Sequence, residues 1–484
     1  MYYMEKIIKD KNFYSRLFGD NPRIIQSKKR MLETVWEIFR RRFYQGTPRQ
    51  EIFLLSVPNR VELLGKHTDY QGGETFLLTG PKNFFAISAV SNDGVTDLVN
   101  ANPDFGETVL RLHGREPEMV AEGEGSNYTY TVAKRLLNNL VDSGLSHLQL
   151  KDVKSVFFGD IPFGGGTSGS SAKLITDFFI FASVSGLLTD KDFTSLIIEN
   201  GKKAGLKMGN EEVNDFTLAL SMYLAYHENG FDFGDLKGDR GVGTFGGSED
   251  HTAILLGERN TLLYCRYCPT EIIDKVDVPQ DYAIVVAYSG KKAEKTKEAM
   301  LKYNRLSEEA ASAVRRLNEI NGTRFHLLRD FFKELPVHER ADAAYEQLAK
   351  SGEGIRIAER ACQFFRETEI TQRAFGCLKE RDIGEFGRLI NDSHNLSKKY
   401  LKNIVPEIDF LQKSANHMGA PGATGFGAGF GGSCYAVVSE SCFPDFIESW
   451  KEKYIKKYPQ YKNLARFDVY SACRGVFWEE MNAQ

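Results

Sequence analysis

The sequence has few cysteines, no long apolar run and no large excess of charge. Its seven cysteines among 484 residues are scattered and odd in number, which argues against a disulfide framework and fits a reducing cytoplasm. No uncharged apolar run is long enough to span a bilayer, and the first residues lack the apolar core of a signal peptide. The formal net charge of -3 gives no general attraction to nucleic acid or to an anionic membrane. We therefore expect a soluble cytoplasmic protein without nucleic-acid or membrane partners.

Length and the order of the expected elements indicate two α+β domains. A chain of 484 residues is too long for one ordinary core. Short strands alternate irregularly with helices, unlike the regular spacing of a parallel βαβ sheet. A boundary near 278–281 divides the chain into an N-terminal domain, 1–280, and a C-terminal domain, 281–484.

Apolar periodicity predicts individual elements. Expected strands are 52–57, 61–64, 84–90, 108–112, 153–158, 282–288 and 435–438. Expected helices are 28–44, 128–140, 172–188, 192–204, 212–227, 293–317, 342–349, 354–365 and 370–380.

The most informative stretch is a glycine-rich segment, residues 159–172, between an apolar strand and a long apolar segment. Glycines let the backbone approach a ligand closely, and the free N–H groups at a helix start favour an anion such as phosphate. Ser170 and Ser171 at the helix entrance can cap the helix, contact a phosphate or help to hold a divalent cation. Because the loop lacks the lysine of a Walker A motif, a glycine turn with capping serines is the alternative interpretation.

A second polar cluster follows the apolar strand at 52–57. Arg60, Lys66, His67 and Asp69 gather near three glycines at the end of the next apolar stretch. Asp and His can accept from and donate to a hydroxyl-rich substrate, and Arg60 can neutralise developing negative charge. A solvated turn whose charges pair with one another is the alternative.

Two further glycine-bearing loops lie downstream. The loop that begins at residue 241 delivers Glu249, Asp250 and His251 to the start of an apolar segment, where one of them can act as a general base. Sequence spacing does not choose among the three, and an acidic helix cap is the simpler interpretation. A third glycine cluster, 419–434, leads into a strand-like run.

These clusters, in this order and at these separations, resemble the three motifs of the GHMP small-molecule kinase superfamily, and the first resembles its galactokinase branch. Residues 58–73 are similar to the galactokinase signature Gly-Arg-Val-Asn-Leu-Ile-Gly-Glu-His-Thr-Asp-Tyr-Asn-Gly-Gly. The resemblance continues through 247–250, 303–305, 386–395 and 427–432. It implies a two-domain α+β fold, with a ribosomal protein S5 domain 2-like N-terminal domain, a ferredoxin-like C-terminal domain, and the active site in the cleft between them.

The resemblance also implies roles for single residues. Asp250 matches the catalytic aspartate that takes the proton from the anomeric hydroxyl of the sugar, and Arg60 matches the arginine that stabilises the transferred phosphoryl group. The matched sugar-pocket positions are His67, Asp69, Gly247 and Tyr303, with Lys66 as a further substrate-binding candidate. The matched ATP-phosphate positions are Gly164, Gly165, Gly166, Thr167, Ser168, Gly169, Ser170 and Ser171, with Ser170 and Ser171 as candidate Mg²⁺ ligands. We therefore expect an ATP- and Mg²⁺-dependent monomeric enzyme that phosphorylates the C1 hydroxyl of galactose or a close analogue.

Three positions depart from the family pattern. The phosphate loop is one residue longer than usual, which leaves open which serine meets the metal. Thr424-Gly-Phe-Gly427 stands where the family commonly has Arg-Met-Thr-Gly, so an arginine and a hydroxyl are missing.

The third departure is Lys66, which stands where galactokinases have a glutamate that hydrogen-bonds the C6 end of the sugar. Lysine offers only donors and a positive charge, which favours a carboxylate at C6 and hence a hexuronate such as galacturonate. The alternative is that Lys66 points to solvent or pairs with an acid such as Glu62. A regulator that binds sugar and ATP without turnover is a further possibility, against which the presence of Ser171 and Asp250 argues.

Overall fold

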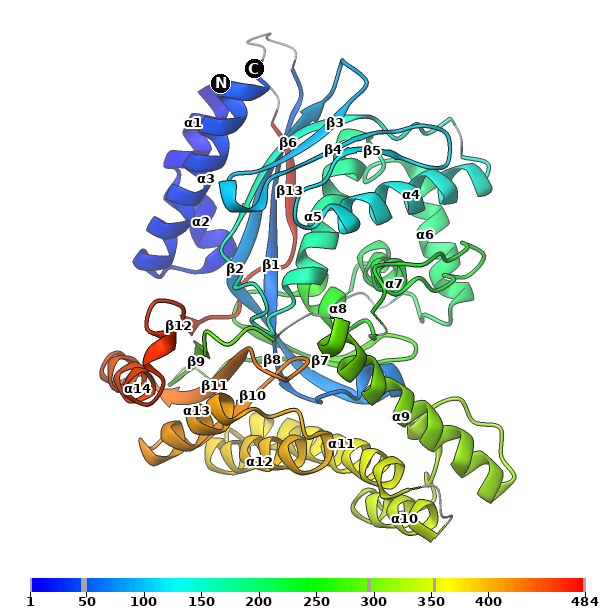
Figure 1. Cartoon of the computed structure of the whole chain (residues 1–484), viewed down its shortest axis with the longest axis vertical. Coiled ribbons are helices and arrows are strands. Elements are labelled where there is room, and N and C mark those ends of the chain that lie inside the picture. Colours follow the sequence, from blue (N-terminus) through cyan, green and yellow to red (C-terminus); the bar gives the residue numbers. More distant parts are fainter. Residues whose placement is uncertain are drawn as a thin grey trace.

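Two long antiparallel strands, β1 (Ile52–Leu64) and β2 (Glu74–Val90), form the centre of the larger of two sheets in the computed structural model (Figure 1). The structure describes residues 2–44, 50–145, 147–209, 211, 213–244, 246–279, 281–293, 297–350 and 354–481. The sequence predicted separate strands at 52–57 and 61–64. In the structure they form one strand, because the polar residues between the two apolar runs are also buried in the sheet. The pairing of this strand with β2 shifts register between Pro58 and Arg60.

The remaining strands of this sheet extend it on both sides of the central pair. The strand order from edge to edge is β13-β1-β2-β6-β3-β4-β5. In addition, β7 pairs with the first residues of β2, 74–77, and β8 pairs with β7. β3 and β6 pair in parallel. The added strands are β3 (Thr96–Asn100), β4 (Glu107–Arg111), β5 (Glu118–Ala121), β6 (Val153–Gly159), β7 (Thr261–Arg266), β8 (Glu271–Asp277) and β13 (Phe477–Met481).

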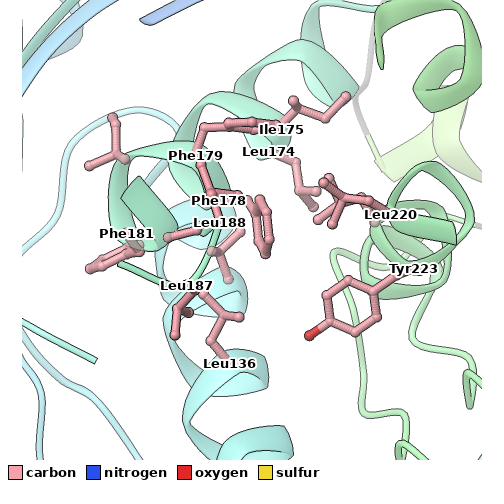
Figure 2. Packing of buried hydrophobic residues seen from close by; sticks show 14 of the residues in the cluster. Leu136, Leu174, Ile175, Phe178, Phe179, Phe181, Leu187, Leu188, Leu220 and Tyr223 are labelled. Atoms are coloured by element: carbon pink, nitrogen blue, oxygen red, sulfur yellow. The ribbon is translucent and has the colours of Figure 1, made fainter. Parts of the chain in front are cut away.

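Helices cover both faces of this sheet (Figure 1). One face carries α4 (Ser126–Asp142), α5 (Gly169–Val184), α6 (Lys191–Lys203), α7 (Asp215–Asn229) and α8 (Glu249–Leu256). Figure 2 shows apolar side chains of α5 meeting Leu136 of α4 and Leu220 of α7. Because α5 is buried on nearly every side, its apolar residues are not confined to one face, and its buried charges, Lys173 and Asp177, pair with each other at 2.5 Å.

The smaller sheet has four antiparallel strands in the order β10-β11-β9-β12. They are β9 (Tyr282–Tyr288), β10 (Gly422–Gly425), β11 (Ser433–Ser439) and β12 (Arg466–Tyr470). One face packs against α13 (Pro406–His417) and α14 (Phe443–Lys457), and the other against α11 (Ile355–Glu380) and α12 (Ile383–Leu396). The first turns of α11 also pack with α9 (Lys297–Asn321) and α10 (Val337–Lys350). Where the sequence predicted two helices at 354–365 and 370–380, one continuous α11 is found.

The two sheets with their helices confirm the predicted α+β fold with two domains. The expected boundary at 280/281 falls between β8 and β9, which belong to different sheets. The last strand, β13, nevertheless returns to pair with β1 of the first sheet. Among the described residues, no helix has the length and apolar character needed to cross a bilayer.

Three N-terminal helices, α1 (Tyr2–Lys9), α2 (Lys11–Phe18) and α3 (Pro22–Arg42), cover the opposite face of the large sheet. Their buried polar contact is Lys28 of α3, which is only 2% exposed. Its Nζ lies 2.7 Å from Asp160 Oδ2 and donates to Asn83 Oδ1 at 2.8 Å. Since Asp160 directly follows β6, this ion pair joins the N-terminal helices to the start of the glycine-rich loop.

We expect Lys28→Met to lower the free energy of unfolding by about 2–3 kcal/mol, because it leaves the Asp160 carboxylate with only the more distant Lys82, whose Nζ lies 4.0 Å from Oδ2. The matched control is Lys29→Met, whose side chain is 42% exposed and whose change should stay within about 0.5 kcal/mol. Chemical denaturation of the wild type, Lys28→Met and Lys29→Met measures the change in the free energy of unfolding for each variant. Equal loss in the two variants would contradict a specific role for the buried pair.

Candidate active site

One cavity of about 440 Å³ collects residues from all three glycine-rich motifs. The residues singled out in the sequence that line it are Arg60, His67, Asp69, Gly164, Gly165, Gly166, Ser168, Gly169, Ser170, Ser171, Gly247, Glu249, Asp250, His251 and Tyr303. The third motif contributes Gly427, Ala428, Gly429 and Phe430. Lys66 and Thr167 are not among the lining residues. The structure therefore brings the end of β1, the start of α5 and the start of α8 to one place.

Arg60 joins these segments. Its Nε donates to Asp250 Oδ1 at 2.7 Å, its Nη2 donates to Glu249 Oε1 at 2.6 Å, and its Nη1 donates to the carbonyl of Gly166 at 3.2 Å. Asp250 in turn accepts a hydrogen bond from Ser171 Oγ at 3.2 Å. Arg60 is 5% exposed, so these charge-assisted contacts are largely shielded from water. A cation, two carboxyl groups and the phosphate loop thus form one connected group.

The pKa values of the two carboxyl groups bound by Arg60 are shifted in opposite directions. Burial alone would raise the pKa of Asp250, but Arg60, His251 and the hydroxyls of Ser168 and Ser171 hold it below its usual value. Burial and the nearby Glu62 raise the pKa of Glu249 well above its usual value. Of the three candidates that the sequence left open, Asp250 is the one that both meets Ser171 and stays ionised.

The third candidate, His251, also lines the cavity, where it contacts a different carboxyl group. Its Nε2 lies 3.0 Å from Oε2 of Glu228, and both side chains are buried.

The part of the cavity next to Asp250 carries neutral and acidic hydrogen-bonding groups. Burial and the charge of Arg360 lower the pKa of His67 to about 3, so its imidazole is neutral. Burial raises the pKa of Asp69 to about 6. The rings of His67 and Tyr303 lie 5.6 Å apart. Gly247 is required beside them, because a Cβ at this position would overlap the Asp69 carboxylate. Such donors and acceptors suit the hydroxyls of a small polar ligand.

Lys66 is turned away from this cavity. It is 2% exposed, and its Nζ donates to Ser393 Oγ at 2.9 Å and to Thr424 Oγ1 at 2.5 Å. It lines instead a separate cavity of about 10 Å³. The sequence predicted that the Lys66 ammonium group binds the C6 end of a sugar in the cavity. The structure contradicts this prediction, because the side chain points away from the large cavity, toward Ser393 and Thr424. Two of the three departures from the family pattern, Lys66 and Thr424, instead contact one another.

This contact predicts that positions 66 and 424 are coupled. Lys66→Glu alone would place a second acid beside Glu367, whereas adding Thr424→Arg supplies a new cation at the same place. We expect Lys66→Glu to lower the stability, and the double variant to recover about 1–3 kcal/mol relative to the sum of the two single changes. Chemical denaturation of the wild type, both single variants and the double variant gives this coupling. Additive effects would show that the two sites are independent.

The phosphate loop is held in a defined conformation by the third motif. Ser433 Oγ donates to the carbonyl of Gly165 at 2.6 Å, and the backbone N–H of Ala293 donates to the carbonyl of Gly164 at 2.7 Å. Ser168 adopts a left-handed backbone (φ 59°) at the point where α5 begins. The first backbone N–H groups of α5 are thereby directed toward the cavity end that Ser170 and Ser171 line, which suits an anion.

Beyond this loop the cavity becomes aromatic. Phe84, Phe105, Tyr128, Phe157 and Phe163 line it together with Asn100 and Asn102. A flat heterocycle attached to phosphates fits such a surface.

The cavity also offers oxygen ligands for a divalent cation. The described residues contain no group of three or more His, Cys, Asp or Glu side chains that could hold a metal alone. The hydroxyls of Ser170 and Ser171 and the carboxyl groups of Glu228 and Asp250 nevertheless share the cavity. Mg²⁺ commonly takes one or two protein oxygens and completes its shell with phosphate and water. These residues therefore fit a nucleotide-bound Mg²⁺.

Several lining residues were not singled out in the sequence. Glu62 lies two residues after Arg60 on β1, hence on the same face, and accepts from the backbone N–H of Gly427 at 2.9 Å. Strand alternation could have found it. Glu228 and the aromatic residues of the nucleotide end carry no local sequence signal, because their own elements bring them to the cavity only in the folded chain.

The chain is similar in sequence to known kinases. Residues 37–86 match the family model for the galactokinase galactose-binding signature, and residues 374–456 match that for the GHMP kinases C terminal. The chain is 28% identical over 434 residues to a galactokinase of Fusobacterium nucleatum, covering 88% of this chain and 95% of that protein. It is 25% identical over 414 residues to a galactokinase of Limosilactobacillus reuteri, covering 81% and 87%.

A solved structure also shares the fold. The galactokinase of Lactococcus lactis complexed with galactose superposes with a TM-score of 0.68, over 91% of this chain and 98% of that one, at 22% identity. The two-domain α+β fold is that of the GHMP small-molecule kinases. In sequence, the chain resembles the galactokinase-like branch of that superfamily.

Proposed function

We propose that this protein transfers the γ-phosphoryl group of ATP to the C1 hydroxyl of galactose or a close neutral analogue. The observation that carries the proposal is the connected group of Arg60, Asp250 and Ser171, which joins the sugar-signature strand to the phosphate loop within one cavity. Phosphoryl transfer depends mainly on positioning and electrostatics, and this group can supply both.

In the proposed mechanism, the Asp250 carboxylate accepts the proton of the C1 hydroxyl. The sugar oxygen then forms a bond to the γ-phosphorus while the bond to the bridging oxygen breaks, and ADP leaves with that electron pair. Arg60 stabilises the negative charge on the phosphoryl group in transit and keeps Asp250 ionised. The loop from Gly164 to Ser171 holds the phosphates through its backbone N–H groups, and Mg²⁺ bound near Ser170 and Ser171 would offset phosphate charge.

The charge of the cavity supports a neutral sugar over a hexuronate. Its lining holds the carboxyl groups of Glu62, Asp69, Glu249 and Asp250 with the cations Arg60 and Lys173, while Lys66 is directed elsewhere. Arg60 and Lys173 are already paired with Asp250 and Asp177, so a substrate carboxylate would meet the ionised Asp250 without a cation of its own. His67, Asp69, Gly247 and Tyr303 are the proposed contacts of the sugar hydroxyls.

A coupled assay of ADP release with galactose, galacturonate and other hexoses tests the proposal. We expect galactose-dependent ADP release and a C1-phosphorylated product, identified by ³¹P NMR. Sugar binding without ADP release would indicate a non-catalytic sensor. Equal or better use of galacturonate would overturn the argument from cavity charge.

A further inference from the structure

Helix α11 has a polar, fully buried face that contacts the loop after β1, residues 65–70, which we call the sugar-signature loop. Arg360, Gln363 and Glu367 stand at helical spacings of three and four residues, so they share one side of the helix. Each is 0% exposed. None of the three lines the large cavity. Buried polar side chains require hydrogen-bond partners, and these three find theirs in the loop that follows β1.

Their contacts fall on the backbone of consecutive loop residues. Glu367 Oε1 accepts from the N–H of Gly65 at 3.0 Å and from the N–H of Lys66 at 3.3 Å. Gln363 Nε2 donates to the carbonyl of Lys66 at 3.0 Å.

Arg360 continues this ladder by one residue. Its Nη2 donates to the carbonyl of His67 at 2.6 Å and to the hydroxyl of Tyr70 at 2.9 Å. Its Nη1 donates to Gln363 Oε1 at 2.6 Å, so the polar face is itself connected.

The loop needs these partners because its backbone leaves the sheet. β1 ends at Leu64, and Gly65 and His67 adopt left-handed backbone conformations with φ of 99° and 58°. Such a conformation is costly for a residue with a side chain and persists when its surroundings fix it. The same loop carries His67 and Asp69 into the cavity.

Arg360 also reaches the helix that carries Tyr303. Its Nε donates to the carbonyl of Leu306 at 3.2 Å, less than one turn of α9 after Tyr303. One buried guanidinium therefore contacts both segments that bring His67 and Tyr303 to the sugar end of the cavity.

We propose that the polar face of α11 positions the sugar end of the active site, with Arg360 and Gln363 as positioning residues for His67, Asp69 and Tyr303. The inference rests on the proposed sugar-kinase function. It assigns control of sugar affinity to side chains of the C-terminal domain that do not line the cavity. The phosphate loop contacts other segments, so ATP affinity should not depend on this face.

The test variant is Gln363→Met, which keeps the length of the side chain and removes both of its hydrogen bonds. We expect the KM for galactose to rise about tenfold, the effect of about one lost hydrogen bond. The KM for ATP should stay within about twofold, because the phosphate-loop contacts are untouched. The matched control is Gln372→Met, nine residues further along α11 and therefore on the opposite side of the helix. Its two KM values should equal those of the wild type.

A second pair of variants covers the case in which Gln363→Met folds poorly. Arg360→Lys keeps a cation and part of the donor set, whereas Arg360→Leu removes both, so the lysine variant should recover part of the galactose affinity lost in the leucine variant. A folded Gln363→Met protein with unchanged KM for galactose would overturn the proposal. Parallel increases in both KM values would overturn it as well.

Amide hydrogen exchange separates this inference from the proposed function. Peptides covering residues 65–70 should exchange faster in Gln363→Met than in Gln372→Met, with peptides of the phosphate loop unchanged. This readout requires no substrate. If the wild type shows no galactose-dependent activity, the proposed function fails, while the exchange data still decide whether α11 fixes the loop.

Discussion

Asp250→Asn is expected to give a folded protein whose kcat with galactose and ATP is lower by about 10²–10⁴-fold, the usual contribution of a positioned general base. The amide keeps the shape of the carboxyl group. Its oxygen can accept from Arg60 in the place of Oδ1, and its NH2 group can donate to the Ser171 hydroxyl in the place of Oδ2, but the amide cannot take the proton of the C1 hydroxyl. Binding of sugar and ATP, measured by calorimetry, should change much less than kcat.

Glu249→Gln is the matched control for this change. Glu249 is the neighbouring residue, bonds to the same guanidinium, and has a pKa held well above its usual value by burial and by Glu62. An amide therefore resembles its native protonated form, and we expect a loss of at most about tenfold. Equal losses in the two variants, or an active Asp250→Asn enzyme, would contradict the assignment of Asp250 as the base.

The convergence of the three motifs could be predicted, but only through the family resemblance. Arg60 and Asp250 are 190 residues apart, and no local periodicity indicates that they form a hydrogen bond. Residue types alone did predict what each segment binds. The glycine loop between a strand and a helix indicated an anion, and the charged residues at a strand end indicated a polar ligand. The structure adds the bonds from Arg60 to both carboxyl groups and to Gly166.

Lys66 shows where sequence reasoning from a single position is insufficient. Its residue type suggested a charged substrate, yet the direction of a side chain depends on what packs around it. Ser393 and Thr424, both fully buried and more than 300 residues away in the chain, accept its hydrogen bonds. The sequence identified both departures from the family pattern, but only the fold shows that they contact each other.

The polar face of α11 could not be found for a related reason. In sequence, Arg360, Gln363 and Glu367 resemble any solvated helical surface, since charged and amide side chains are usually exposed. Their burial follows from packing between α9, α12 and the end of β1, which involves long-range contacts. The same holds for β13, whose return to the first sheet no local pattern predicts.

Arg60→Met is expected to produce the largest loss. A guanidinium that stabilises a transferred phosphoryl group contributes about 10³–10⁵-fold to kcat, and in this protein the same group also keeps the base ionised. Removing it leaves the buried Glu249 and the partly buried Asp250 without the guanidinium that binds them, so circular dichroism must first show that the variant is folded. Arg60→Lys is the matched control, because it retains the positive charge but not the three separate donors.

The pH dependence distinguishes the two roles of Arg60. In the wild type, the pKa of Asp250 lies below its usual value, so the carboxylate stays ionised and kcat should not vary between about pH 5 and 8 on its account. Without Arg60, burial raises this pKa, so a larger fraction of Asp250 is protonated at low pH and the residual kcat of Arg60→Met should increase as the pH rises. Arg60→Lys should keep the flat profile at a reduced rate. A flat profile in Arg60→Met would mean that Arg60 does not control the ionisation of the base.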